Sequence, residues 1–66
     1  MPTGSNPPLG EELRSRRQAR GLHQLELAAT LDTTTVEIAA WENGERAPSD
    51  EHAAALVELL GESEQS

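Results

Sequence analysis

The stretch that decides the fold is residues 24–43, QLELAATLDTTTVEIAAWEN. Its apolar residues recur at the spacing of an α-helix, with Leu27 and Leu31 on one face of a first helix. Ile38 and Trp41 are three residues apart and share one face of a second helix. The pattern therefore predicts two short helices joined by a tight turn.

The segment between these helices carries the signals of a turn and a helix start. Asp32 stands where the backbone often needs a positive φ, which Asp tolerates better than most residues. Thr34 is the expected N-cap, and Glu37 three residues later would complete a capping box, so the second helix should begin at Thr35. Ala28 supplies the small side chain that two crossing helices need where they touch. The layout is that of a helix-turn-helix.

Two further helices are predicted outside this unit. Gly21 should end a first helix that covers about 8–20, and Ser49 should cap a last helix that Gly61 ends. The expected organisation is a flexible N-terminal arm at 1–7, a domain at 8–61 and a polar tail at 62–66. The expected core is Leu13, Leu22, Leu27, Ala28, Leu31, Ile38, Trp41, Ala53, Leu56, Val57 and Leu60. Leu25 and Leu59 are expected to be exposed, either as dimer contacts or as single surface residues.

Composition limits the classes of protein that remain. The 66 residues allow one small domain, and no cysteine is present for a disulfide or a thiolate metal site. The chain also lacks Lys and Tyr, its two histidines are far apart, and it has no glycine-rich phosphate loop. No apolar run is long enough to cross a membrane, and no signal-peptide pattern is present. We therefore expect a cytoplasmic protein that is not an enzyme and uses no cofactor, metal or small molecule.

The chain carries an ordered set of residues: Arg-Gly-Leu at 20–22, Gln24, Glu26-Leu27-Ala28, Leu31, Ile38, Trp41-Glu42-Asn43-Gly44 and Pro48-Ser49. With this set the chain resembles, from Leu9 to Gly61, the phage-repressor and Cro-like helix-turn-helix family, also called XRE-like. The resemblance implies an all-α, lambda-repressor-like domain of four helices, or of five with the last one truncated. It also implies sequence-specific binding of double-stranded DNA by a small transcriptional regulator, a repressor that acts as a homodimer.

The resemblance assigns roles to individual residues. Arg17 and Glu42 would form an ion pair between the first and third helices, where the alternative is two unrelated surface charges. The implied DNA-binding residues are Gln24, Thr34, Thr35, Val36, Ala40, Asn43, Arg46 and Arg16. Gln24 could instead be a solvated polar residue, and Asn43 could simply cap its helix. Val36 and Ala40, both expected to face outward, could only pack on thymine methyl groups. Recognition would then depend on DNA shape or on thymine, unless this face contacts no base.

Charge is the main argument against DNA binding, because the formal net charge is −7 and DNA-binding domains are usually basic. The acid is concentrated towards the C-terminus: residues 9–22 carry +2, residues 23–46 carry −4 and residues 47–66 carry −5. An alternative function is therefore an acidic protein-interaction module of the same fold, such as an antitoxin, an antirepressor or an accessory subunit. Its partner would be a basic protein that contacts Asp50, Glu51 and Glu58.

Overall fold

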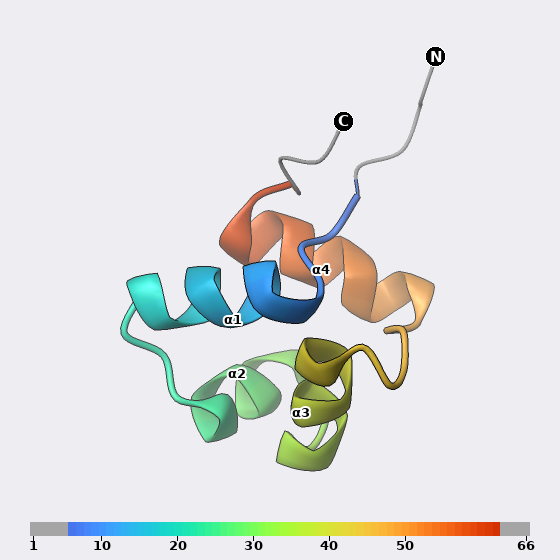
Figure 1. Cartoon of the computed structure of the whole chain (residues 1–66), viewed down its shortest axis with the longest axis horizontal. Coiled ribbons are helices and arrows are strands. Elements are labelled where there is room, and N and C mark those ends of the chain that lie inside the picture. Colours follow the sequence, from blue (N-terminus) through green and yellow to red (C-terminus); the bar gives the residue numbers. More distant parts are fainter. Residues whose placement is uncertain (1–5, 63–66) are drawn as a thin grey trace.

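The computed structural model describes residues 6–62, so that residues 1–5 of the predicted arm and 63–66 of the predicted tail lie outside the described part of the chain. Within this part of the chain the structure is all-α, as predicted, with four helices. They are α1 (Gly10–Ala19), α2 (Gln24–Leu31), α3 (Thr35–Asn43) and α4 (Asp50–Leu60). Helix α1 crosses the middle of the molecule, with α4 on one side of it and the α2–α3 pair on the other (Figure 1).

The first three helices end in the same way. Gly21, Asp32 and Gly44 have φ angles of 72°, 59° and 76°, which confirms the positive φ expected at Asp32. After each of them, the next backbone N–H donates to a carbonyl five residues earlier, as in Thr33 to Ala28 at 2.8 Å. This is the Schellman motif, in which a left-handed residue reverses the chain and satisfies the last carbonyls of the helix. The tight turn between α2 and α3 is therefore determined by local backbone chemistry.

The predicted start of the first helix is wrong by two residues. Leu9 is the N-cap of α1, and its backbone is extended, with φ −134° and ψ 165°. Pro8 precedes it and is fully buried, a core position that the sequence analysis missed. Because the backbone of Leu9 lies outside the right-handed helical region, the helix cannot begin before Gly10.

The core contains the residues expected to be central. Its fully or nearly fully buried members are Leu13, Leu27, Ala28, Leu31, Ile38, Trp41, Leu56 and Leu60. Leu22 is half-buried against this cluster, and so is Leu59, which corrects the expectation that Leu59 is exposed. Ala53 and Val57 are also half-buried, whereas they were predicted as core. Because few side chains are buried, we expect the free energy of unfolding of this domain to be small.

His52 joins the start of α4 to the end of α2. Its ring Nε2 lies 3.1 Å from the carbonyl oxygen of Leu31, and its Nδ1 lies 3.2 Å from the hydroxyl of Ser49. A carbonyl only accepts, so Nε2 is the donor and the Ser49 hydroxyl donates to Nδ1. The same Ser49 oxygen accepts from the His52 backbone N–H, which confirms Ser49 as the N-cap of α4. The imidazole ring also packs against the indole of Trp41, with 5.3 Å between the two ring centroids.

Residues 6–62 contain neither a membrane-spanning helix nor a metal-binding cluster. None of the helices is both long and apolar enough to cross a membrane. No cluster of three or more His, Asp or Glu side chains in this part of the chain could hold a metal ion.

Candidate nucleic-acid interface

The helix-turn-helix unit is held to the rest of the domain by the predicted pair of Arg17 and Glu42. The guanidinium Nε donates to Glu42 Oε2 at 2.6 Å and Nη2 donates to Oε1 at 3.3 Å. Both side chains are buried, at 7% and 3% exposed. Arg17 also donates to the Leu22 carbonyl at 2.8 Å, so this one side chain connects α1, the following loop and the end of α3. The alternative of two unrelated surface charges is wrong.

Gln24, the first residue of α2, belongs to the same network. Its amide nitrogen donates to Glu42 Oε1 at 3.1 Å, and the side chain is half-buried. The amide thus serves to satisfy a buried carboxylate. To contact a DNA phosphate, Gln24 would have to use the second N–H of its amide or give up the bond to Glu42.

The first turn of α3 and its N-cap include two exposed residues. Thr34 is exposed, and its hydroxyl accepts from the backbone N–H of Glu37 at 3.2 Å, as its predicted N-cap role requires. The side chain of Thr35 is half-buried, and Val36 is 74% exposed. Val36 and the N-cap residue Thr34 are therefore accessible to a ligand at the start of α3, and Thr35 is partly accessible.

The prediction that Ala40 faces outward is wrong, and its burial gives no support to the predicted base contact. Ala40 is only 9% exposed, although it lies one helical turn after Val36. Its backbone carbonyl accepts from the Glu45 N–H at 2.8 Å, in the Schellman motif at Gly44. The accessible surface of α3 is therefore shorter than helical periodicity alone predicts.

Arg46 lies in that loop and pairs with α3. Its Nη1 is 2.6 Å from Glu37 Oε2, so the carboxylate of Glu37 does not complete the predicted capping box. This partner was not predicted from the sequence. The signal that could have indicated it is Gly44, because a glycine at the end of a helix can reverse the chain and return a loop cation towards the start of that helix. Asn43, the last residue of α3, is exposed next to this loop.

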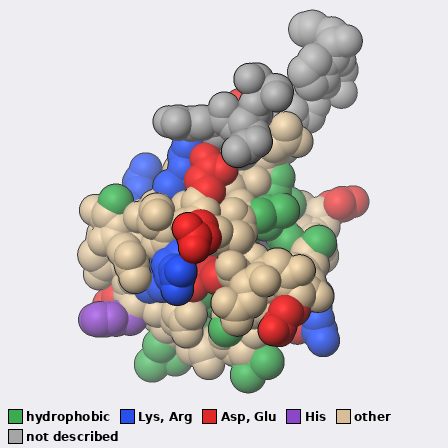
Figure 2. Space-filling view, viewed as in Figure 1, with side chains coloured by type: hydrophobic (Ala, Val, Ile, Leu, Met, Phe, Trp, Pro, Cys, Tyr) green, Lys and Arg blue, Asp and Glu red, His purple; other side chains and the backbone are tan. Residues whose placement is uncertain are grey.

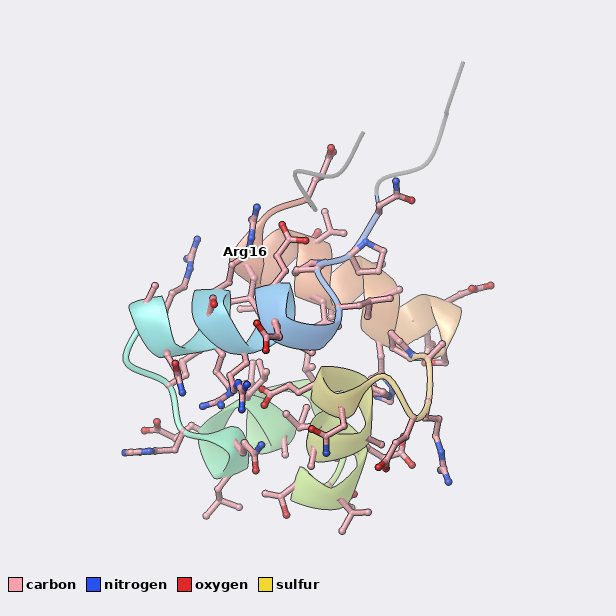
Figure 3. All side chains as sticks on the ribbon, viewed as in Figure 1. Arg16 is labelled. Atoms are coloured by element: carbon pink, nitrogen blue, oxygen red, sulfur yellow. The ribbon has the colours of Figure 1, made fainter. Side chains whose placement is uncertain are left out.

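Arg16 lies on a different side of the molecule from the other predicted DNA contacts. Figure 3 shows it on the α4 side of α1, away from α2 and α3. Its Nη1 donates to the Leu60 carbonyl at 2.7 Å, and its Nη2 pairs with Glu12 at 3.1 Å. A Cβ on Gly61 would come within 2.9 Å of the same guanidinium. Arg16 therefore secures the end of α4, and this position gives no support to a DNA contact beside α3.

The fold and this surface define a class of protein: a compact all-α domain that carries a helix-turn-helix with an exposed second helix. A comparison with protein families agrees with that class. A family described as "Helix-turn-helix" matches residues 13–66, most of the chain. The protein therefore belongs to the XRE-like helix-turn-helix family of DNA-binding regulators. No curated protein and no solved structure gives a match.

Proposed function

We propose that this protein binds a specific sequence of double-stranded DNA as a small cytoplasmic transcriptional regulator, and that it acts as a repressor on a two-fold operator as a homodimer. The observation that carries the proposal is the exposed first turn of α3 on a firmly held two-helix unit. In this class of protein the second helix enters the major groove with its N-terminal residues towards the bases, while the first crosses the backbone.

The charge distribution is compatible with this function but predicts weak non-specific binding. Each helix of the unit carries an acid in its first turn, Glu26 in α2 and Glu37 in α3, and these oppose an approaching phosphate. Of the other acids, Asp50, Glu51 and Glu58 lie on α4, and the start of this helix contacts α2 and α3 through His52. Salt screens exposed charges that lie beyond the Debye length, which is about 8 Å at physiological ionic strength. Affinity should therefore depend on a matching sequence and only weakly on salt.

Selection from a pool of random duplex DNA, at low and at moderate salt, tests the proposal. We expect an enriched motif at both salt concentrations. A dimer would give an inverted repeat whose half-sites are separated by about 10 base pairs or a multiple of that distance. Absence of any enriched motif at both salt concentrations would contradict sequence-specific binding.

Arg46 provides a second prediction for the selected duplex. Arg46→Ala is expected to weaken binding and to reduce the salt slope by about 0.9, the loss of one phosphate contact. Glu37→Gln is expected to strengthen binding about two- to fivefold, because the phosphate no longer competes with the carboxylate that holds Arg46 at 2.6 Å. Fluorescence anisotropy across a salt series measures both effects.

Glu45→Gln is the matched control, since Glu45 is the exposed neighbour of Arg46 and the substitution changes the net charge by the same amount. A general charge effect would make Glu37→Gln and Glu45→Gln equal. The ion-pair explanation requires that Glu37→Gln has the larger effect and that this excess disappears when Arg46 is also replaced by Ala.

A second candidate function rests on α4. This helix carries Asp50, Glu51 and Glu58 and no basic residue, and a shallow groove on its surface lies between Asp50 and Glu58, lined by Ala53, Ala54 and Val57. An apolar groove with a carboxylate at each end suits a basic amphipathic segment of another protein. If selection enriches no duplex, and if reversing the charges of Asp50 and Glu58 abolishes binding to such a protein, this function replaces the first.

A further inference from the structure

Two large apolar side chains protrude from the helix-turn-helix unit. Leu25 and Val36 are each the second residue of their helix, and they are 70% and 74% exposed. The starts of α2 and α3 lie at the lower edge of the molecule in Figure 1, on the side away from α4, and hydrophobic side chains project from the same edge in Figure 2. The edge that would meet the DNA is thus apolar at its most exposed points.

Three polar side chains of the helix-turn-helix unit already have partners within the domain. The Gln24 amide donates to Glu42, the Thr34 hydroxyl accepts from the Glu37 N–H, and the Glu37 carboxylate pairs with Arg46. The structure therefore holds the amide, the hydroxyl and the acid in internal contacts and leaves the isopropyl group of Val36 as the most exposed group in the first turn of α3. The hydroxyl of Thr35, which could donate to a base edge, belongs to a half-buried side chain, so Val36 is the more accessible of the two.

The major groove offers one apolar group for such a side chain to contact, the 5-methyl group of thymine. We infer that Val36 is a specificity-determining residue that packs on a thymine methyl group, so that the protein selects sites by a methyl group as well as by DNA shape. This inference rests on the proposed function. Leu25 lies on the helix that crosses the backbone, so it has no equivalent base to contact.

A protein partner is the other class of ligand that an exposed valine could serve. Stable protein interfaces bury about 800 Å² on each side around an apolar core. Here the exposed apolar groups are two single side chains, with the acids Glu26 and Glu37 next to them in the sequence. Such an edge is too small and too charged for an interface core, whereas a single isopropyl group is the right size for one methyl group.

The inference is tested first by two selections, one from a random duplex pool that contains thymine and one from a pool with deoxyuridine in its place. Deoxyuridine pairs like thymine and lacks only the methyl group. We expect a motif with a fixed thymine from the first pool, and loss of the preference at that position in the second. Replacing that thymine by deoxyuridine in a single duplex should weaken binding about fourfold, the effect of leaving one methyl group unburied.

A cycle of protein and DNA changes then identifies the residue. Val36→Ala should weaken binding to the thymine duplex and should no longer distinguish thymine from deoxyuridine. Leu25→Ala is the matched control, because it also shortens an exposed apolar side chain in the first turn of a helix, and it should distinguish the two duplexes as the parent does. Alanine favours a helix, and both positions are exposed, so neither change should unfold the domain.

The outcomes separate the inference from the proposed function. An enriched motif with equal affinity for thymine and deoxyuridine duplexes overturns the methyl contact and leaves DNA binding intact. Discrimination that survives Val36→Ala also overturns it. If neither pool yields a motif, both proposals fail, and loss of a protein complex on Val36→Ala would then assign the valine to a protein interface.

Discussion

Replacing Trp41 with alanine is expected to unfold the domain. The indole is 1% exposed at the centre of the core, and Trp41 is the only aromatic residue of the chain. Removing a large buried side chain costs about 3–5 kcal/mol, because its contacts are lost and the cavity is only partly filled by relaxation. A core in a chain of this length supplies about the same amount of stability. Far-UV circular dichroism during thermal melting should therefore show no cooperative transition for Trp41→Ala.

A milder change at the same position separates loss of volume from loss of a hydrogen bond. The Trp41 Nε1 has no hydrogen-bond partner within residues 6–62. Trp41→Phe therefore reduces the volume of the buried ring without removing a hydrogen bond to this part of the chain. Trp41→Phe should melt cooperatively at a lower temperature than the parent, and Leu25→Ala at the exposed edge should melt close to the parent. A cooperative melt of Trp41→Ala near the parental temperature would show that the core is centred elsewhere.

Breaking the Arg17–Glu42 pair from one side is expected to destabilise the domain more than removing both charges. Arg17→Met would leave the Glu42 carboxylate buried, with the Gln24 amide as its remaining side-chain partner among the described residues. An unpaired buried charge costs about 3–5 kcal/mol, whereas an apolar replacement of the whole pair is often close to neutral. Glu42→Leu alone should be similarly harmful, because it would leave the guanidinium Nε and Nη2 of Arg17 without their acceptor.

Chemical unfolding of the parent, the two single variants and the double variant Arg17→Met/Glu42→Leu measures this coupling. If a single variant is unfolded in buffer, addition of trimethylamine oxide restores a transition, and the four free energies are compared at one concentration of this osmolyte. Additive losses in the double variant would mean that the two side chains stabilise the fold independently. That result would also remove the argument that the pair holds α3 for DNA.

Much of the candidate surface was predicted from the sequence, but the partners of its residues were not. The spacing of residues 24–43 predicted both helices, the turn and the exposure of Val36. It did not predict that the Gln24 amide bonds Glu42 or that Arg46 is held by Glu37. These contacts join residues that are 18 and 9 positions apart, so they depend on how the helices and the loop pack rather than on any pattern within one helix.

The sequence by itself determined the elements whose signals act within one helical turn. Asp32, Gly44 and Ser49 end or begin helices through their own backbone and side-chain bonds, and apolar spacing selects the buried faces. Only the tertiary structure decided that Ala40 and Leu59 are covered and that Arg16 secures α4 rather than approaching α3. Periodicity specifies the direction of a side chain around its helix, but the segment that covers it is known only once the chain has folded back.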